Sequence, residues 1–347
     1  MAISLTFLLL FSSSFLFLFL FIHHLLGIIR QRRDENSGHG PPTYPFIGCL
    51  ISFYKNRHRL LDWYTDLLAE SQTQTIAVHR LGARRTIITA NPDNVEYILK
   101  TKFDNFPKGK PFTEILGDLL GRGIFNVDGE LWHTQRKLAS HEFTAKSLRT
   151  FLVNTLEIEV KERLLPIMES ACANSRELDL QDLLRSFAFD IICKVSLGID
   201  PGCLDPSLPA SRLAKAFDVA SEISARRGMS PVFGVWKAKR ALRIGSEKRL
   251  REAVELVHSS VMEIIRSKKL KHAEESKDGE GVEGKDLLSR LILGGHDEEF
   301  VVAAIMRRFE LQPVSRDRPV FVPLLTAHMD GGFKAMVRER HMKCHVP

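Results

Sequence analysis

Residues 106–136 read FPKGKPFTEILGDLLGRGIFNVDGELWHTQR, a stretch that combines Pro- and Gly-rich turns with a helical pattern. Its last part predicts a helix that Asp128 caps and that carries Trp132 and Arg136. Positions four apart share a helix face, so the indole N–H and the guanidinium can both reach one carboxylate along that face. Taken alone, the W-x-x-x-R spacing also suits an ordinary exposed pair on an amphipathic helix.

Helical patterns dominate the sequence on both sides of this stretch. In residues 180–197 apolar side chains recur at spacings of three and four over much of the helix girth, so this helix needs partners on several sides. Asn91 followed by Pro92 is a helix start, and residues 75–80 with 85–89 around Gly82 predict a small hairpin. Further helices are expected at 59–70, 93–100, 147–168, 210–226 and 239–271.

The carboxyl-terminal part has a different character. Residues 272–285 are rich in Glu, Lys and Gly and predict an exposed loop. Residues 301–309 are expected to be helical, whereas three prolines among β-branched residues after them predict strands and a terminal hairpin across Gly331 and Gly332. The fold class expected is therefore mainly α with small β pieces near the two ends.

The amino terminus carries an apolar run of the length of a bilayer. Residues 3–22 hold fifteen apolar positions and five Ser or Thr, and no charged side chain precedes Arg30. A cleaved secretory signal would show a basic start and a shorter apolar core, so an uncleaved transmembrane helix is expected over 1–29. A basic and proline-rich hinge follows over 30–48, and its three arginines favour a body that faces the cytosol.

Composition restricts the class of protein. The chain has 347 residues, of which 44% are hydrophobic and 26% charged, which is typical of a globular protein. Its five cysteines have no paired spacing, which fits a reducing compartment. The net charge of +7 suits an anionic membrane face, and because the basic residues lack an interleaved aromatic pattern, no nucleic-acid partner is expected.

The apolar anchor, the hinge and the W-x-x-x-R helix together resemble a microsomal cytochrome P450, a haem-thiolate monooxygenase. Residues 106–112 and 115–129 resemble the plant subfamily that oxidises the terminal carbon of fatty acids and of fatty-acid-derived jasmonate conjugates. The resemblance runs from about residue 41 to 296 and resumes at about 301, where 308–309, 318–329 and 331–333 look like the closing helix and hairpin of the family.

This resemblance implies a cofactor, partners and site residues. It implies haem, NADPH delivered through a cytochrome P450 reductase, a fatty acyl substrate, and a single-pass location in the endoplasmic reticulum membrane. By the same resemblance Trp132 and Arg136 bind a haem propionate. Four loop residues would line the substrate pocket, although a glycine-hinged surface loop is the alternative: Arg122, Gly123, Ile124 and Phe125.

The oxygen chemistry of the family depends on a cysteine motif that is not found in this sequence. The family places its iron-binding cysteine in F-x-x-G-x-R-x-C-x-G, and none of the five cysteines has this context: Cys49, Cys172, Cys193, Cys203 and Cys344. Cys193 is expected in the core, and Cys344 completes only half of a C-x-x-C-H motif. No catalytic residue and no metal ligand is therefore assigned.

Two further motifs of the family are matched only by coincidence. Residues 294–297 give the first four letters of the oxygen-activating pattern A/G-G-x-D/E-T-T/S, but Glu298 and Glu299 replace the threonines. Glu263 and Arg266 satisfy E-x-x-R far ahead of its expected place, so an ordinary surface pair is expected.

These absences fall together, which suggests an internal deletion between about Glu299 and Val302. The deletion would join an amino-terminal part of the P450 domain, 49–299, to a carboxyl-terminal helix and hairpin, 300–347, and would remove the central helix and the haem-cysteine loop. The apolar faces of 147–168 and 180–197 would then lose a partner. The chain is an inactive family member by this interpretation; the alternative is a truncated fragment without haem, from splicing, a gene-model error or a pseudogene.

Overall fold

The computed structural model describes residues 40–275 and 309–339, apart from 45, 83–84, 144–145, 206, 209, 316 and 324, together with Phe21. The transmembrane helix expected over 1–29 lies outside the described residues apart from Phe21, as do the expected junction at 299–302 and Cys344. Among the described helices, none is both long and apolar enough to span a bilayer. The chain divides into two compact units, residues 1–106 with 229–238, and residues 107–228 with 239–347.

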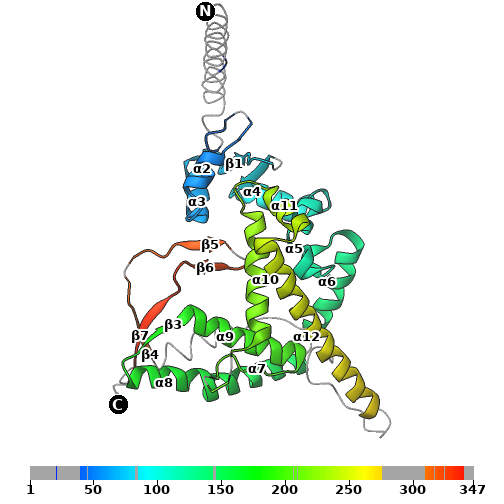
Figure 1. Ribbon diagram of the computed structural model, residues 1–347, viewed down its shortest axis with the longest axis vertical. Coiled ribbons are helices and arrows are strands. Elements are labelled where there is room, and N and C mark those ends of the chain that lie inside the picture. Colours follow the sequence, from blue (N-terminus) through cyan, green and yellow to red (C-terminus); the bar gives the residue numbers. More distant parts are fainter. Residues whose placement is uncertain are drawn as a thin grey trace, which may run out of the picture. The chain divides into compact units, whose positions relative to one another are not determined.

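The first unit is a small α+β body (Figure 1). The elements are α2 (Leu50–Lys55), α3 (Leu60–Glu70), β1 (Thr75–Val78), β2 (Thr86–Thr89), α4 (Pro92–Glu96), a π-helical turn (Tyr97–Thr101) and a 3₁₀ turn (Phe103–Asn105). β1 and β2 form the expected antiparallel hairpin, with Ile76 opposite Ile88. Asn91 caps α4, since its side chain accepts the backbone N–H of Asp93 and Asn94.

The end of the hinge expected over 30–48 is described from residue 40 onward, apart from 45. Tyr44 and Gly48 exchange both backbone hydrogen bonds at 2.9 Å, and Gly48 also bridges to Arg80. Gly48 has φ +59°, and a Cβ there would meet the His79 carbonyl oxygen at 2.1 Å. The described end of the hinge is therefore folded against β1 of its own unit.

The second unit holds the long helices and the carboxyl-terminal strands. Its helices are α5 (Gly109–Leu120), α6 (Gly129–Phe143), α7 (Lys146–Glu159), α8 (Leu165–Ala173), α9 (Leu180–Ile192), α10 (Arg212–Gly228), the end of α11 (Val235–Leu242) and α12 (Gly245–Glu275). A 3₁₀ turn (Ile124–Asn126) precedes α6, and π-helical turns (Val160–Leu164 and Cys193–Leu197) follow α7 and α9. The strands are β3 (Glu177–Asp179), β4 (Phe309–Pro313), β5 (Phe321–Pro323), β6 (Ala327–Met329) and β7 (Lys334–Glu339).

The strands correct two expectations about the carboxyl-terminal part. β7 pairs antiparallel with both β3 and β4, while β6 pairs with β5, so no hairpin joins β6 and β7 across Gly331 and Gly332. Phe309 begins β4 and does not end a helix, and residues 301–308 lie outside the description. At Phe309 itself, pairing with Glu339 of β7 takes the place of the predicted helical conformation, and the side chain is fully buried.

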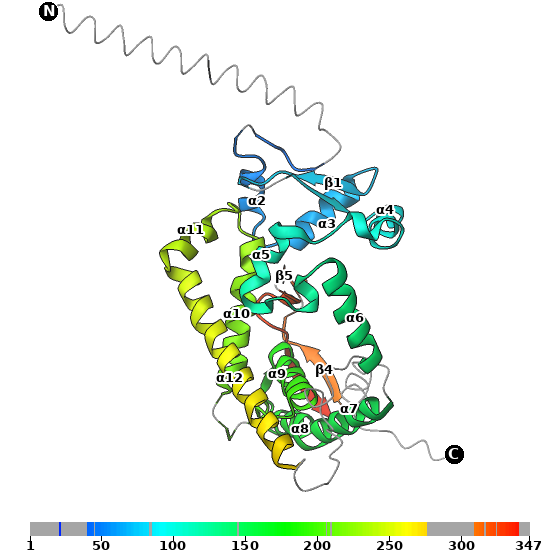
Figure 2. The same ribbon diagram turned by 90° about the vertical axis from the view of Figure 1, so that its right-hand side faces the viewer.

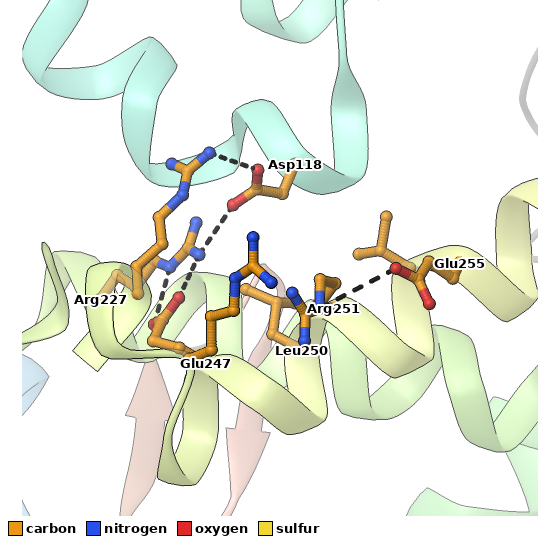
Figure 3. Close-up of a pocket in the computed structure, with 9 residues that line it drawn as sticks. Asp118, Arg227, Glu247, Leu250, Arg251 and Glu255 are labelled. Atoms are coloured by element: carbon orange, nitrogen blue, oxygen red, sulfur yellow. Dashed lines mark hydrogen bonds and ion pairs between the residues drawn. The ribbon is translucent and has the colours of Figure 1, made fainter.

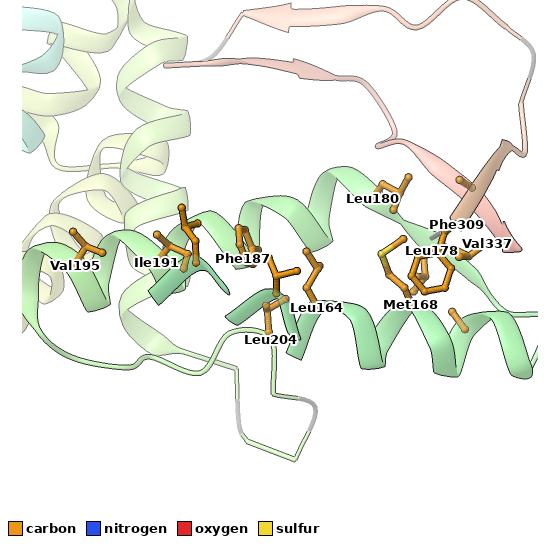
Figure 4. Close-up of a cluster of buried hydrophobic side chains, with 14 residues drawn as sticks. Leu164, Met168, Leu178, Leu180, Phe187, Ile191, Val195, Leu204, Phe309 and Val337 are labelled. Atoms are coloured by element: carbon orange, nitrogen blue, oxygen red, sulfur yellow. The ribbon is translucent and has the colours of Figure 1, made fainter. Parts of the chain in front are cut away.

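The principal core lies between α7–α9 and this three-stranded sheet (Figure 4). The expectation that 147–168 and 180–197 lack a partner is wrong for the stripe that faces the sheet. Leu180, Phe187 and Ile191 are each at most 8% exposed, although Ile192, one position on, is 52% exposed. The core comprises residues from both ends of the unit: Leu156, Val160, Leu164, Met168, Leu178, Leu180, Phe187, Ile191, Val195, Phe309 and Val337.

A second core joins α5, α10 and α12, and Figure 2 shows α10 and α12 side by side. The helix expected over 239–271 is in fact two helices, because α11 ends at Leu242 and α12 begins at Gly245. Arg243, between them, has φ +57°, so the chain turns there in the left-handed region. α12 continues to Glu275, beyond the start of the loop expected at 272.

Candidate functional site

The segment that leads into α6 brings the expected haem-propionate residues to the protein surface. Trp132 is half-buried and Arg136 is exposed, four residues apart on α6. The Lys108 ammonium lies 5.7 Å from the centre of the Trp132 ring, a cation–π contact. Within the described residues the Arg136 guanidinium has no ion-pair partner, so its N–H groups are available to an anionic group.

Asp128 ties residues 106–112 to the start of α6. Its carboxylate accepts the backbone N–H groups of Lys108 and Gly109, both at 3.0 Å. The Lys108 ammonium donates in turn to the Val127 carbonyl oxygen at 2.9 Å. The N–H of Gly109 and then that of Lys108 lower the pKa of the Asp128 carboxyl, so Asp128 is ionised at neutral pH. The clamp fixes Lys108 beside Trp132.

The expected substrate-pocket loop is fixed to the same helix. Gln135 of α6 donates from Nε2 to the Arg122 carbonyl oxygen at 2.9 Å. The buried Asn126 side chain donates to the Gly121 carbonyl oxygen at 2.8 Å and closes the loop onto the end of α5. Arg122 and Gly123 are exposed, Ile124 is half-buried and Phe125 is 72% exposed. The two sets of site residues are therefore joined through one turn of α6.

Three of the cysteines that the structure describes have thiols with a raised pKa: Cys49, Cys193 and Cys203. Cys193 is 4% exposed, which confirms its expected place in the core. Burial, and secondarily the charge of Asp190, raises the pKa of the Cys193 thiol to about 12. Burial and a hydrogen bond to Asp190 raise the pKa of the Cys203 thiol to about 12 as well. Burial also raises the pKa of Cys49. These thiols are protonated at neutral pH, whereas a metal ligand must be ionised.

The remaining motif matches lie apart from this region. Glu263 and Arg266 are both exposed on α12, in agreement with a surface pair. Residues 294–297 lie outside the described part of the chain. Among the residues described, no group of three His, Cys, Asp or Glu side chains has a metal-binding arrangement.

Several residues that organise the site were not predicted from the sequence. The contacts of Lys108, Gln135 and Asp128 form only because the chain reverses between α5 and α6. No local sequence pattern predicts this reversal. Arg227 does leave a sequence signal, because it continues the buried stripe of Ala216, Ala220 and Ile223 on α10. A guanidinium on the apolar face of a helix requires a buried acidic partner, and the structure supplies one.

Comparison with known proteins identifies the fold and the family of this chain. The fold resembles the crystal structure of the cytochrome P450DA heme domain, with a TM-score of 0.53 and 14% identity over 72% of this chain and 50% of that one. The family described as Cytochrome P450 matches residues 39–307. The chain belongs to the cytochrome P450 family.

Relatives within the family are plant proteins. Cytochrome P450 94B3 of Arabidopsis thaliana is 56% identical over 82% of this chain and 57% of its own length. Cytochrome P450 94B1 of the same plant is 60% identical over 76% of this chain and 51% of its own length. Cytochrome P450 94A1 of Vicia sativa is 43% identical over 78% of this chain and 52% of its own length. The chain thus spans about half the length of these relatives.

The residues of this chain fit only part of a haem. The exposed Arg136 and the half-buried Trp132 suit a propionate on one face of α6. The buried Cys193 and the half-buried Cys203 do not suit the iron, because both thiols hold their protons far above neutral pH. The haem-dependent steps of the family therefore have no donor among these thiols.

Proposed function

We propose that this chain is a catalytically inactive member of the cytochrome P450 family, anchored in the endoplasmic reticulum membrane with its body in the cytosol. The ancestral activity is the NADPH- and dioxygen-dependent hydroxylation of fatty acids, or of fatty-acid-derived hormone conjugates, at or near the terminal carbon. The observation that carries the proposal is that no cysteine of the 347 residues stands in F-x-x-G-x-R-x-C-x-G.

The assignment of the ancestral activity rests on relatives and on the loop before α6. The relatives numbered 94 share 43–60% identity with the chain over most of its length. Residues 106–129, which resemble the fatty-acid-oxidising subfamily, form one connected segment that Asp128 and Gln135 hold in place. The exposed Phe125 supports a role of this loop against an apolar substrate in a complete relative.

The absence of activity follows from the role of the thiolate. In the family a cysteine thiolate donates electron density toward the iron and favours cleavage of the O–O bond. Without this ligand the NADPH reductase would have no haem-thiolate centre to reduce. The internal deletion between about Glu299 and Val302 accounts for this loss and for the missing oxygen-activating threonines together.

The first experiment is a spectrum of the purified full chain, reduced and saturated with carbon monoxide. We expect no thiolate-type Soret band, while Cytochrome P450 94B1 prepared in the same way supplies the positive control. A thiolate-type band from this chain would overturn the proposal and favour the active hydroxylase.

A chimera provides the reverse test. Inserting the segment of Cytochrome P450 94B1 that the alignment lacks, at the junction after Glu299, should restore the band. The same chimera with its haem-ligand cysteine changed to alanine is the matched control and should stay colourless. A messenger RNA that reads without interruption through a single exon across 299–302 would remove splicing or a gene-model error as the origin of the junction.

A further inference from the structure

The turn between α11 and α12 carries a serine that follows two arginines. Residues 240–246 read RALRIGS, so Arg243 stands three residues before Ser246 and Arg240 stands six residues before it. An arginine three residues before a serine is a charge pattern that arginine-directed protein kinases recognise, because their substrate groove presents carboxylates to the guanidinium. In the whole sequence R-x-x-S occurs once more, at Ser230, and R-x-x-T does not occur. The sequence alone does not distinguish the two serines.

The surroundings of Ser230 exclude it as a kinase substrate. Its hydroxyl donates to the Val232 carbonyl oxygen at 2.9 Å. The arginine three residues before it, Arg227, is 3% exposed, and Figure 3 shows this side chain between Asp118 and Glu247. Its Nη2 lies 2.7 Å from the Asp118 carboxylate and 2.5 Å from that of Glu247. A buried and paired guanidinium cannot enter the groove of a kinase unless this cluster is broken.

Ser246 has the opposite environment. The five residues before it, 241–245, are all exposed, and Ser246 itself is half-buried. Within the part of the chain that the structure describes, neither the Ser246 hydroxyl nor the Arg243 guanidinium has a hydrogen-bond or ion-pair partner. Arg240 is paired with Asp118 at 3.0 Å, so recognition of this segment depends on Arg243. Both groups of the pattern are therefore accessible to a kinase.

The backbone before Ser246 is already outside the helical conformation. Arg243 has φ +57° and Gly245 has φ +58°, so both lie in the left-handed region. Ser246 is the second residue of α12, and the first four N–H groups of a helix have no acceptor within the helix. A kinase binds its substrate as an extended segment, and residues 243–246 can reach that conformation by local opening of a single turn.

A phosphate on Ser246 would be stabilised where it forms. Phosphoserine carries about −1.5 to −2 charges at neutral pH, and a negative charge in the first turn of a helix interacts favourably with the helix dipole. Arg249 follows Ser246 by three residues on α12, so the two side chains share a helix face. Arg249 is exposed and, among the residues described, has no ion-pair partner. Arg243 and Arg249 thus supply guanidinium donors on the two sides of the serine.

We propose that Ser246 is the phosphorylation site of an arginine-directed protein kinase, and that Arg249 then binds the phosphate at the start of α12. The phosphoryl donor is MgATP. The Ser246 Oγ forms a bond to the γ-phosphorus, the bond from this phosphorus to the β,γ-bridging oxygen breaks, ADP leaves, and the hydroxyl proton passes to a carboxylate of the kinase. This modification uses neither haem nor NADPH, so it does not depend on whether the chain is catalytically active.

The test incubates the full chain in lipid nanodiscs with the catalytic domain of a calmodulin-dependent protein kinase, Mg²⁺ and ATP, and maps the phosphate by mass spectrometry. We expect phosphate at Ser246, and S246A should lose it. R243Q should slow the modification by roughly tenfold, because it removes a charge-assisted contact with the kinase. R249Q is the matched control, since it makes the same change of charge on the other side of the serine and should leave the initial rate unchanged.

Hydrogen exchange of the modified chain provides the second measurement. Phosphorylation should slow exchange of the amides of 247–250 by roughly two- to fivefold, and R249Q should remove part of this gain.

Four results would overturn the proposal. The first is a chain that the kinase does not modify at Ser246. The second is modification of Ser230 at an equal rate, since burial of Arg227 would then not protect that serine. The third is equal slowing by R243Q and R249Q, because bulk charge would then explain the rate. The fourth is unchanged hydrogen exchange after phosphorylation, because Arg249 would then not hold the phosphate.

Discussion

Substitution of Phe309 tests whether the carboxyl-terminal strands belong to the core of this chain. Phe309 is completely buried at the start of β4, and Figure 4 shows its ring among Met168, Leu178 and Val337. Met168 comes from α8 and Val337 from β7, so this ring joins parts of the chain that are more than 130 residues apart in sequence. In F309A the ring is removed, and with it a contact between the two sides of the proposed junction.

The magnitude follows from the cavity that F309A would leave. Truncation of a buried Phe to Ala costs about 3–5 kcal/mol, which is a large part of the total stability of about 5–15 kcal/mol of a typical domain. Phe321 in β5 provides the matched control, since its 36% exposure makes it a partly solvated phenylalanine of the same carboxyl-terminal segment. F321A should cost about 1 kcal/mol or less, because less surface is removed from a packed environment.

The assay is urea unfolding of the full chain in detergent, followed by pulse proteolysis at increasing urea. We expect one cooperative loss of protection for the parent chain, because the sheet covers α8 and α9. F309A should move the midpoint to clearly lower urea than F321A does. Equal midpoints for F309A and F321A would refute the argument, since the strands would then contribute nothing to the core on which this fold rests.

Three further predictions use local contacts. D128A removes the acceptor of two backbone N–H groups at the start of α5, so it should destabilise the chain by about 1–2 kcal/mol and expose 106–112 to protease. An unchanged cleavage pattern would contradict the role of the Asp128 carboxylate in holding this segment. The hydrogen bonds from Arg163 lower the pKa of Asp200 to about 2, so the stability from this pair is present above about pH 4 and is lost as pH falls toward about 2; D200N should flatten urea midpoints over that range. The pKa values of about 12 predict slow alkylation of Cys193 and Cys203 at neutral pH in the folded chain and faster alkylation in urea; equal rates by mass spectrometry would contradict the raised pKa of the buried Cys193 and the half-buried Cys203.

Local patterns in the sequence were sufficient for much of the helical framework. The apolar stripe through Leu180 and Ile191 predicted α9, and the Asn91–Pro92 pair predicted the first residue of α4. Both are local: the stripe repeats within one helix, and the cap binds N–H groups two and three residues away. Such features can be predicted without knowledge of the rest of the fold.

The features that the sequence did not predict depend on distant pairing. β7 pairs with β3 across 155–159 residues and with β4 across 22–30 residues, so no pattern local to Phe309 indicates a strand there rather than a helix. The break at Arg243 was missed because an arginine in a left-handed turn resembles an ordinary helical residue in the basic run 239–271. The cluster around Arg227 was missed because its two acidic partners lie on α5 and α12.

The segment 106–136 connects the buried Arg227 cluster with the expected haem-propionate residues. Asp118, near the end of α5, binds the buried Arg227. Asp128, ten residues later, clamps the start of α6 and thereby places Trp132 beside Lys108. These contacts join residues between 108 and 247, before the proposed junction near 299, whereas the family's cysteine loop would follow that junction. The proposed deletion would therefore remove the iron ligand and leave both sets of contacts in place, so D128A should expose 106–112 to protease even in a chain without haem.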